Sequence, residues 1–267
     1  MKENLIVKEL PIDLNKIYQV ALGAAYHSGQ ILCQYYGQLK HVEKKGAIDL
    51  VTEADLTSEK TVKMIIQDKY PDHGIVAEES GIQTTQTPYE WIIDPLDGTT
   101  NYAHQIPIFA VSIAFVVEKH PVVGIVYNPV SQDLFTAIKG QGAYYNRQSI
   151  KVSQRKDLHE SVLVTGFPYN LKEIIDPLMI RFSNCLQAAQ AVRRLGAAAL
   201  DLCFIASGRF EGFWEQNLKP WDTAAGMLIA QEAGSHITNF SNEPYHYQMS
   251  EILATNGYIH QELLRCL

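Results

Sequence analysis

The fold of this 267-residue chain is decided by one stretch, WIIDPLDGTTNY, which runs from Trp91 to Tyr102. Its apolar first half predicts a buried strand over Tyr89–Asp94 that delivers Asp94 at its end. Pro95 removes a backbone donor and stiffens the following turn, and Asp97 comes three residues after Asp94. If the chain turns helically here, both carboxylates project to the same side, and they mark a candidate site.

The residues after this acid pair favour a phosphate ligand. Gly98 lets the backbone approach a ligand closely, and the run Gly-Thr-Thr presents free N–H groups as a helix N-terminus does. Carboxylate oxygens favour Mg²⁺, which usually takes one or two carboxylates together with a substrate phosphate. An isolated D-x-x-D is usually a solvated turn. The long run directly after an apolar strand favours the functional interpretation instead.

Three other acidic segments are candidates for the same site, each with a structural alternative. Glu78 and Glu79 close a predicted strand over Gly74–Ala77, so that at most one of them can face the pocket. Asp222 begins an apolar helix, where an acid also serves as a simple cap. Asp55 lies in the first turn of another helix and is explained by the helix dipole alone.

Outside these segments, the periodicity predicts a mixed α/β chain with two lobes that meet near residue 150. Helices are predicted at Leu14–Tyr36 with Asp13 as N-cap, from Thr52 with a capping box, and at Asp176–Ala191, Ala197–Ser207, Asp222–Ala233 and Gly257–Arg265. Strands are predicted at Gly74–Ala77, Tyr89–Asp94, Ile108–Glu118, Val122–Tyr127, Leu134–Ala137, Val162–Thr165, Arg209–Glu215 and Ile252–Thr255, with a turn at Lys119–Pro121.

Composition and charge exclude several classes of protein. The 22 Lys and Arg residues are outnumbered by 29 Asp and Glu residues, which gives a net charge of −7, and 46% of the residues are hydrophobic. These values argue against disorder and against a basic nucleic-acid module. No GxSxG, Walker, GxGxxG or HExxH motif is present. The remaining chemistry must use carboxylates, hydroxyls and backbone amides.

The sequence also predicts a cytoplasmic protein that is not bound to a membrane. The first residues contain no continuous apolar segment of the kind that a secretory signal needs. The longest apolar stretch, around Val111–Val117, is far shorter than the roughly 20 residues of a membrane-spanning helix. The four cysteines show no CxxC spacing, which is typical of free thiols in a reducing compartment.

Taken together, these segments resemble the inositol monophosphatase family of Mg²⁺-dependent, lithium-sensitive phosphatases. Trp91–Tyr102 matches the first signature of that family, Trp221–Gly226 matches the second, and the resemblance extends from about Lys44 to Gly226. One departure is Ala77, where many relatives carry glycine. The resemblance implies an α/β (α+β) fold, a layered α-β-α-β-α sandwich of the inositol monophosphatase/fructose-1,6-bisphosphatase type. It also implies an N-terminal lobe over residues 1–150 with most metal ligands and a C-terminal lobe over 151–267.

The family's roles carry over residue by residue. The implied ligands of two or three Mg²⁺ ions are Glu78, Asp94, the backbone carbonyl of Leu96, Asp97 and Asp222. The implied catalytic residues are Thr99 and Asp55, which orient and deprotonate the attacking water, and Glu78, which helps to hold a weaker third ion. The implied substrate-binding residues are Gly98 and Thr99 for the phosphate, and Ala198, Glu215 and Asp222 for the rest of the substrate. Lys44 falls in the segment that corresponds to a mobile loop over the site.

The expected function is hydrolysis of inositol 1-phosphate, or of a similar small polyol phosphate, by direct attack of water. Fructose 1,6-bisphosphate, histidinol phosphate and 3′-phosphoadenosine 5′-phosphate are alternative substrates. A binding protein associated with transcription or ribosomal RNA processing is the alternative outside the enzymes. Arg193 and Arg194 are assigned to a homodimer interface or to structural ion pairs, and the charge balance argues against a nucleic-acid partner.

Repulsion between neighbouring carboxylates should affect the site when no Mg²⁺ is bound. Two like charges about 4 Å apart repel by about 4 kcal/mol at an effective dielectric constant of about 20. We therefore expect raised carboxyl pKa values and a looser Lys44 segment when no Mg²⁺ is bound.

Overall fold

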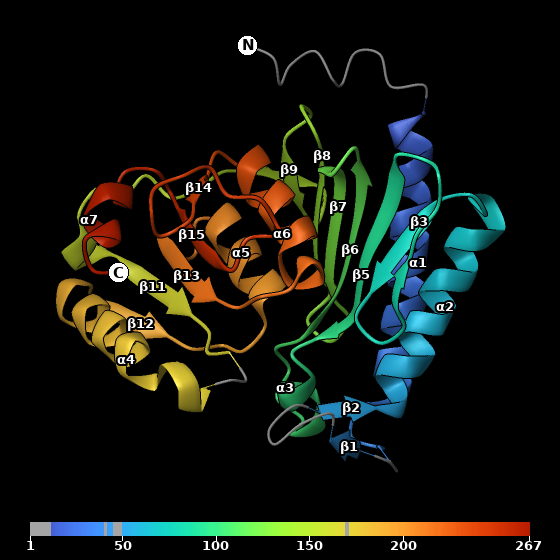
Figure 1. Ribbon diagram of the computed structural model, residues 1–267, viewed down its shortest axis with the longest axis horizontal. Helices are drawn as coiled ribbons and strands as arrows, with labels where there is room; N and C mark the ends of the chain where they lie inside the picture. The colour runs from blue at the N-terminus through green and yellow to red at the C-terminus, as the bar shows by residue number, and fades with distance from the viewer. Residues whose placement is uncertain (1–11, 40–41, 45–49, 169–170) are drawn as a thin grey trace.

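The computed structural model describes residues 12–39, 42–44, 50–168 and 171–267. Helices and sheets alternate in five layers, with α1 and α2 outermost on one side and α4 and α7 on the other (Figure 1). The expected α-β-α-β-α sandwich is thereby confirmed. The helices are α1 (Leu14–Tyr35), α2 (Glu53–Lys69), α3 (Thr99–Ala103), α4 (Leu171–Ala188), α5 (Ala198–Ala206), α6 (Pro220–Glu232) and α7 (His260–Leu264), with a 3₁₀ turn at Leu158–Glu160.

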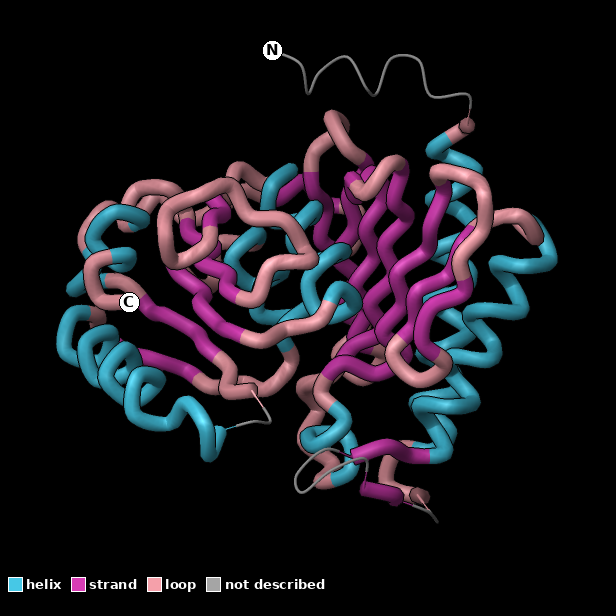
Figure 2. Tube along the Cα trace, in the orientation of Figure 1, coloured by secondary structure: helices cyan, strands magenta, loops and turns pink. Residues whose placement is uncertain are grey.

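The larger sheet has eight strands and is antiparallel except where β3 runs parallel to β5. Its strands lie side by side, with α1 and α2 packed on the outer face (Figure 2). In spatial order its strands are β10 (Gln148–Ile150), β9 (Ala143–Tyr145), β8 (Asp133–Ile138), β7 (His120–Asn128), β6 (Ala110–Val117), β5 (Tyr89–Asp97), β3 (Gly74–Ala77) and β4 (Gly81–Gln83). Every residue of β6 is buried, because α1 covers one face of this strand and α6 covers the other.

The smaller sheet has five strands and mixes both directions of pairing. In spatial order these are β12 (Ala191–Arg193), β11 (Val162–Thr165), β13 (Gly212–Gln216), β15 (Glu251–Thr255) and β14 (His236–Thr238). The first three run parallel to one another, and the last two pairs are antiparallel. A separate two-stranded ribbon joins β1 (Val42–Lys44) to β2 (Leu50–Thr52) just before α2.

Helices α5 and α6 lie between the two sheets because their sequences are apolar on all sides. Residues Thr223–Ala230 of α6 are buried without interruption, and so is nearly all of α5. A helix without a polar face must be covered all round, and two facing sheets provide that cover. Since these two helices pack on both sheets, the division into two lobes at residue 150 stays a prediction.

The outer helices begin where their capping signals predict. Asp13 caps α1 by accepting a hydrogen bond of 3.0 Å from the backbone N–H of Asn15. Thr52 caps α2, and its reciprocal capping box with Asp55 is present. Within the residues that the structure describes, no helix is long and apolar enough to span a membrane.

Several of the predicted boundaries are wrong: the strand expected at Arg209–Glu215 begins at Gly212, and the helix expected at Gly257–Arg265 begins at His260. The helix expected at Asp176–Ala191 begins earlier, at Leu171, and ends at Ala188, since Ala191–Arg193 pairs with β11 as an edge strand. The turn expected at Lys119–Pro121 is a two-residue turn at Glu118 and Lys119, with φ angles of 49° and 65°. Positive φ at both positions is typical of the type I′ turns that match the twist of a hairpin.

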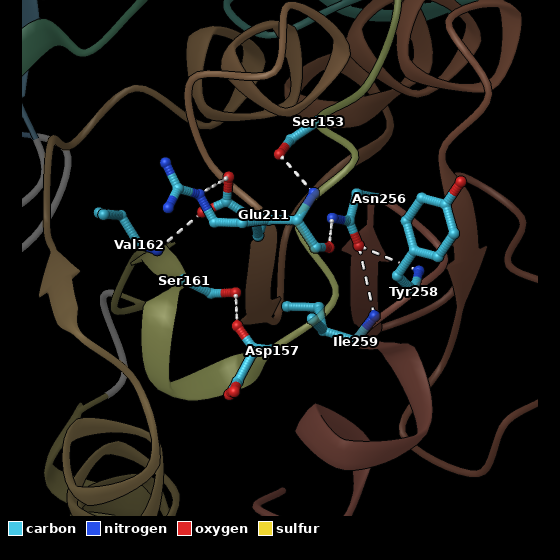
Figure 3. A network of polar contacts seen from close by, with 9 residues as sticks. Ser153, Asp157, Ser161, Val162, Glu211, Asn256, Tyr258 and Ile259 are labelled. Atoms are coloured by element: carbon cyan, nitrogen blue, oxygen red, sulfur yellow. Dashed lines mark hydrogen bonds and ion pairs between the residues drawn. The ribbon is translucent and has the colours of Figure 1, made fainter.

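A buried carboxylate ties the segment after the large sheet to the small sheet (Figure 3). Glu211 accepts a hydrogen bond of 2.8 Å from the backbone N–H of Val162 and pairs with Arg155 Nε at 3.4 Å. Asn256 completes the network by donating to the carbonyl oxygen of Arg155 at 2.7 Å. These contacts hold residues 151–161 against β11 and β15.

Candidate active site

A bulge at the end of β5 brings the first two acids to one side. Asp94 pairs with Ser112 and Asp97 pairs with Ala110 across the β5–β6 ladder, so two residues of β5 lie opposite one residue of β6. The backbone N–H of Leu96 donates to Asp94 Oδ1 at 2.9 Å and fixes the turn. Asp94 is 2% exposed and Asp97 is 8% exposed. The strand is therefore three residues longer than predicted, and its end carries both acids.

Gly98 directs the chain from β5 into α3. Its φ of 91° lies in the left-handed region, and a Cβ there would come within 2.9 Å of the Ile108 carbonyl oxygen. Only glycine meets both conditions without strain. α3 begins at Thr99, directly after Gly98, so its first turn follows the acid pair in the chain.

Thr99 connects the acid pair to Asp55. Its Oγ1 lies 3.3 Å from Asp55 Oδ1 and 3.0 Å from the carbonyl oxygen of Leu96. Asp55 is fully buried, and its other oxygen accepts from both the backbone N–H and the hydroxyl of Thr52. The capping role and the predicted catalytic role therefore use different oxygens of one carboxylate.

Parallel pairing of β3 with β5 brings Glu78 beside Asp94. The backbone N–H of Glu78 donates to the carbonyl oxygen of Ile93 at 3.2 Å. Buried Glu59 on α2 holds the next two residues, since it accepts from the backbone N–H groups of Glu79 at 2.7 Å and Ser80 at 3.0 Å. This clamp fixes the chain just after Glu78.

The layers beyond the large sheet contribute the rest of the site. Asp97 Oδ2 accepts a hydrogen bond of 2.8 Å from the backbone N–H of Ala199 in the first turn of α5. Asp222 lies in the first turn of α6, where it accepts from the backbone N–H of Lys219 at 2.6 Å. Glu215 on β13 rests directly on the backbone of Gly166, where a Cβ would collide with its carboxylate.

These residues surround one cavity of about 460 Å³. Those among its walls that the sequence predicted are Glu78, Asp94, Leu96, Asp97, Gly98, Thr99, Ala198, Glu215 and Asp222. Asp55 lies behind this wall and reaches it through Thr99. The backbone of Lys44 lies in β1, opposite Leu50, and residues 45–49, which follow it, are outside the described part of the chain.

Burial raises the pKa values of both β5 acids well above the ordinary carboxyl range. For Asp94, Glu78 is the next largest cause, and for Asp97 it is Asp222. Burial also raises the pKa of Glu215 to about 8, with a further contribution from Asp222. The expected rise is confirmed, but its largest cause is loss of hydration rather than mutual repulsion.

The donor set suits a hard divalent cation, although it is not prearranged around one. Among the residues that the structure describes, no three His, Cys, Asp or Glu side chains already stand in the geometry of a metal site. The four carboxylates that the sequence predicts as metal ligands all offer oxygen, and two of them, Glu78 and Asp222, are only half-buried.

Arg194 and Asp201 are among the side chains in the wall that were not assigned to the site from the sequence. Arg194, which was assigned to a homodimer interface or to structural ion pairs, lines the cavity, and Asp201 of α5 lies in the same wall. A signal for Asp201 was present, since it is the one acid in the apolar run AALDLCFIA. An acid in a helix that is buried all round is usually paired or functional.

Comparison with known proteins places this geometry among phosphatases. A family model described as "Inositol monophosphatase family" matches residues 13–267. The inositol-1-monophosphatase of Synechocystis sp. is 43% identical over 259 residues, which span 96% of this chain and 90% of that protein. A protein of Aquifex aeolicus named fructose-1,6-bisphosphatase/inositol-1-monophosphatase is 40% identical over 95% of this chain and 96% of its own length. The solved structure of extragenic suppressor protein suhB from Bartonella henselae superposes with a TM-score of 0.91 at 37% identity, covering 94% of this chain and 98% of that one.

Proposed function

This chain belongs to the inositol monophosphatase family, and on that premise we propose that it is a Mg²⁺-dependent phosphomonoesterase acting on a small polyol phosphate such as inositol 1-phosphate. The observation that carries the proposal is the convergence of Glu78, Asp94, Asp97 and Asp222 on one cavity, with Thr99 in its wall bonded to Asp55 behind it. An all-oxygen donor set beside free backbone N–H groups suits metal and phosphate together.

Each group in the wall has a proposed role in binding. Mg²⁺, held by Glu78, Asp94, Asp97, Asp222 and the carbonyl oxygen of Leu96, would supply the positive charge that neutralises the phosphoryl oxygens and acidifies water. The backbone N–H groups of Gly98 and Thr99 hold the phosphate. Glu215 and the backbone at Ala198 hold the leaving alcohol, since both face the same cavity.

Proton transfer uses Thr99 in the cavity wall and Asp55 behind it. The hydroxyl of Thr99 orients the attacking water and accepts its proton, while its own proton passes to Asp55 Oδ1 across the 3.3 Å contact. The second oxygen of Asp55 stays bonded to Thr52, which keeps the accepting oxygen in place. In-line attack by water then displaces the alcohol without a covalent enzyme intermediate.

A panel of phosphate esters tests the proposal. Phosphate release is measured with inositol 1-phosphate, fructose 1,6-bisphosphate, histidinol phosphate and 3′-phosphoadenosine 5′-phosphate, with and without Mg²⁺. We expect Mg²⁺-dependent release that is fastest for the polyol phosphate and is abolished by Asp94→Asn. Asp68→Asn, at an exposed position on α2, is the matched control and should keep the activity. Failure to hydrolyse any of the four esters with Mg²⁺ would overturn the proposal.

Fructose 1,6-bisphosphate is the second candidate substrate because of Arg194. A guanidinium in the cavity wall suits a second phosphate group, and the Aquifex aeolicus relative is named for both activities. A loss of bisphosphate hydrolysis in Arg194→Gln, with inositol 1-phosphate hydrolysis retained, would favour this candidate.

A further inference from the structure

One buried acid in the cavity wall has no part in the proposed metal and phosphate chemistry. Asp201, on the first turn of α5, is 1% exposed and lines the cavity beside Glu215 and Arg194. Among the residues that the structure describes, neither of its carboxylate oxygens has a hydrogen-bond partner. The nearby buried acids Asp97 and Glu211, by contrast, both accept backbone N–H groups.

Such a carboxyl destabilises the fold unless something else satisfies it. A buried polar group that lacks a partner costs about 1–3 kcal/mol, and a charged one costs more. Because Asp201 lines the cavity, a molecule seated there can supply the missing partner. Retention of a destabilising group in a binding cavity is typical of a functional residue.

The surroundings of Asp201 define the chemistry of that partner. Burial raises its pKa, Glu215 raises it further, and Arg194 opposes the rise. The carboxyl oxygens of Asp201 and Glu215 offer several hydrogen-bond acceptors side by side, which suits the neighbouring hydroxyl groups of a sugar or cyclitol.

We propose that Asp201 is a specificity-determining residue, which together with Glu215 hydrogen-bonds the hydroxyl groups of a polyol leaving group. The inference rests on the proposed phosphatase function and names the part of the substrate that the far wall of the cavity recognises. Asp201 therefore contributes to selection of the alcohol and not to transfer of the phosphoryl group.

Two variants at one position test this role. Asp201→Leu removes all hydrogen bonding at similar volume, whereas Asp201→Asn keeps it. For each we compare kcat/KM for inositol 1-phosphate with that for p-nitrophenyl phosphate, whose leaving group carries no hydroxyl for this wall. We expect Asp201→Leu to lower the ratio at least about tenfold, and Asp201→Asn to stay within about threefold of the unaltered protein. Cys203→Ala, also buried in α5, is the control and should leave the ratio unchanged.

Calorimetric titration of myo-inositol, with Mg²⁺ and inorganic phosphate present, gives a readout that needs no turnover. Its affinity should fall in Asp201→Leu and return in Asp201→Asn, while the thermal unfolding temperature of Asp201→Leu stays level or rises. Equal effects on both esters, or unchanged myo-inositol affinity, would overturn the inference. Polyol binding that depends on Asp201, in a protein that hydrolyses none of the esters, would uphold the inference and overturn only the phosphatase proposal. A larger loss with histidinol phosphate than with inositol 1-phosphate would assign Asp201 to an ammonium group and also overturn it.

Discussion

Asp97 Oδ2 and the backbone N–H of Ala199 are joined by a hydrogen bond of 2.8 Å that spans 102 residues of sequence. The bond connects the end of β5 in the large sheet to the first turn of α5 in the central helical layer. It orients one carboxylate of the proposed metal site and sets the distance between the two walls of the cavity. The site therefore exists only when both sheets are assembled around α5.

Mg²⁺ should stabilise the protein through Asp97 and its neighbours. A ligand that binds only the folded state at one hundred times its Kd adds about 2.7 kcal/mol. We expect the thermal unfolding temperature to rise with millimolar Mg²⁺. This gain should be lost in Asp97→Asn, whose amide oxygen can still accept from Ala199. An equal gain in both proteins would place the cation elsewhere.

Replacement of Thr99 should separate chemistry from binding. Thr99→Val removes the hydroxyl between Asp55 and the Leu96 carbonyl at nearly constant volume. We expect kcat to fall by about 10²–10⁴ with little change in KM, whereas Thr99→Ser should retain most activity. Steady-state kinetics with a polyol phosphate decide this, and an unchanged kcat in Thr99→Val would remove the hydroxyl from the mechanism.

Asp55→Asn should affect activity far more than stability. The amide oxygen can replace the carboxylate oxygen that accepts from Thr52, so the cap of α2 should lose no more than about 1 kcal/mol. The amide nitrogen that then faces Thr99 cannot accept a proton, so kcat should fall by at least about 10². Urea unfolding and kinetics on one preparation compare the two effects. A loss of stability that matches the loss of activity would contradict the catalytic role.

Stability without metal should decrease as pH rises. Glu215 has a pKa of about 8 in the folded protein against an ordinary value of 4.5. The folded state thus keeps a proton that the unfolded chain releases between these values. This contribution is complete below pH 4.5 and is lost as pH rises through 8, at about 1.4 kcal/mol per pKa unit.

Urea unfolding in a chelator between pH 5 and 8.5 measures this dependence. The raised pKa values of Asp94, Asp97 and Asp201 act in the same direction. Glu215→Gln should therefore flatten the slope without abolishing it. An identical slope in the variant would show that Glu215 does not keep its proton.

Removal of Glu211 should lower stability without altering the cavity. Its carboxylate holds the backbone N–H of Val162 and the side chain of Arg155 (Figure 3). Glu211→Ala leaves that N–H without its partner, and we expect a loss of about 1–3 kcal/mol in the free energy of unfolding. KM for a polyol phosphate should stay unchanged at temperatures where the variant is folded, and a raised KM would show that the network also supports the site.

Local signals in the sequence were strong enough to predict the long elements and most of the candidate site. The Asp13 cap, the Thr52–Asp55 capping box and the apolar strand that carries Asp94 each depend on interactions within a few residues. The short strands β4, β9, β10, β12 and β14 were not predicted, because three residues give no readable alternation and their conformation is set by the neighbouring strand.

The sequence by itself determined which acids were available, and the resemblance of its motifs supplied their roles. Tertiary structure alone decided which of them meet. It moved Arg194 into the cavity wall, gave Asp97 its partner on α5, and buried Asp201 without one. Residues more than a hundred positions apart come together, and become buried, only when the two sheets pack against the helices between them. Local sequence patterns extend over a few residues and therefore do not predict such contacts.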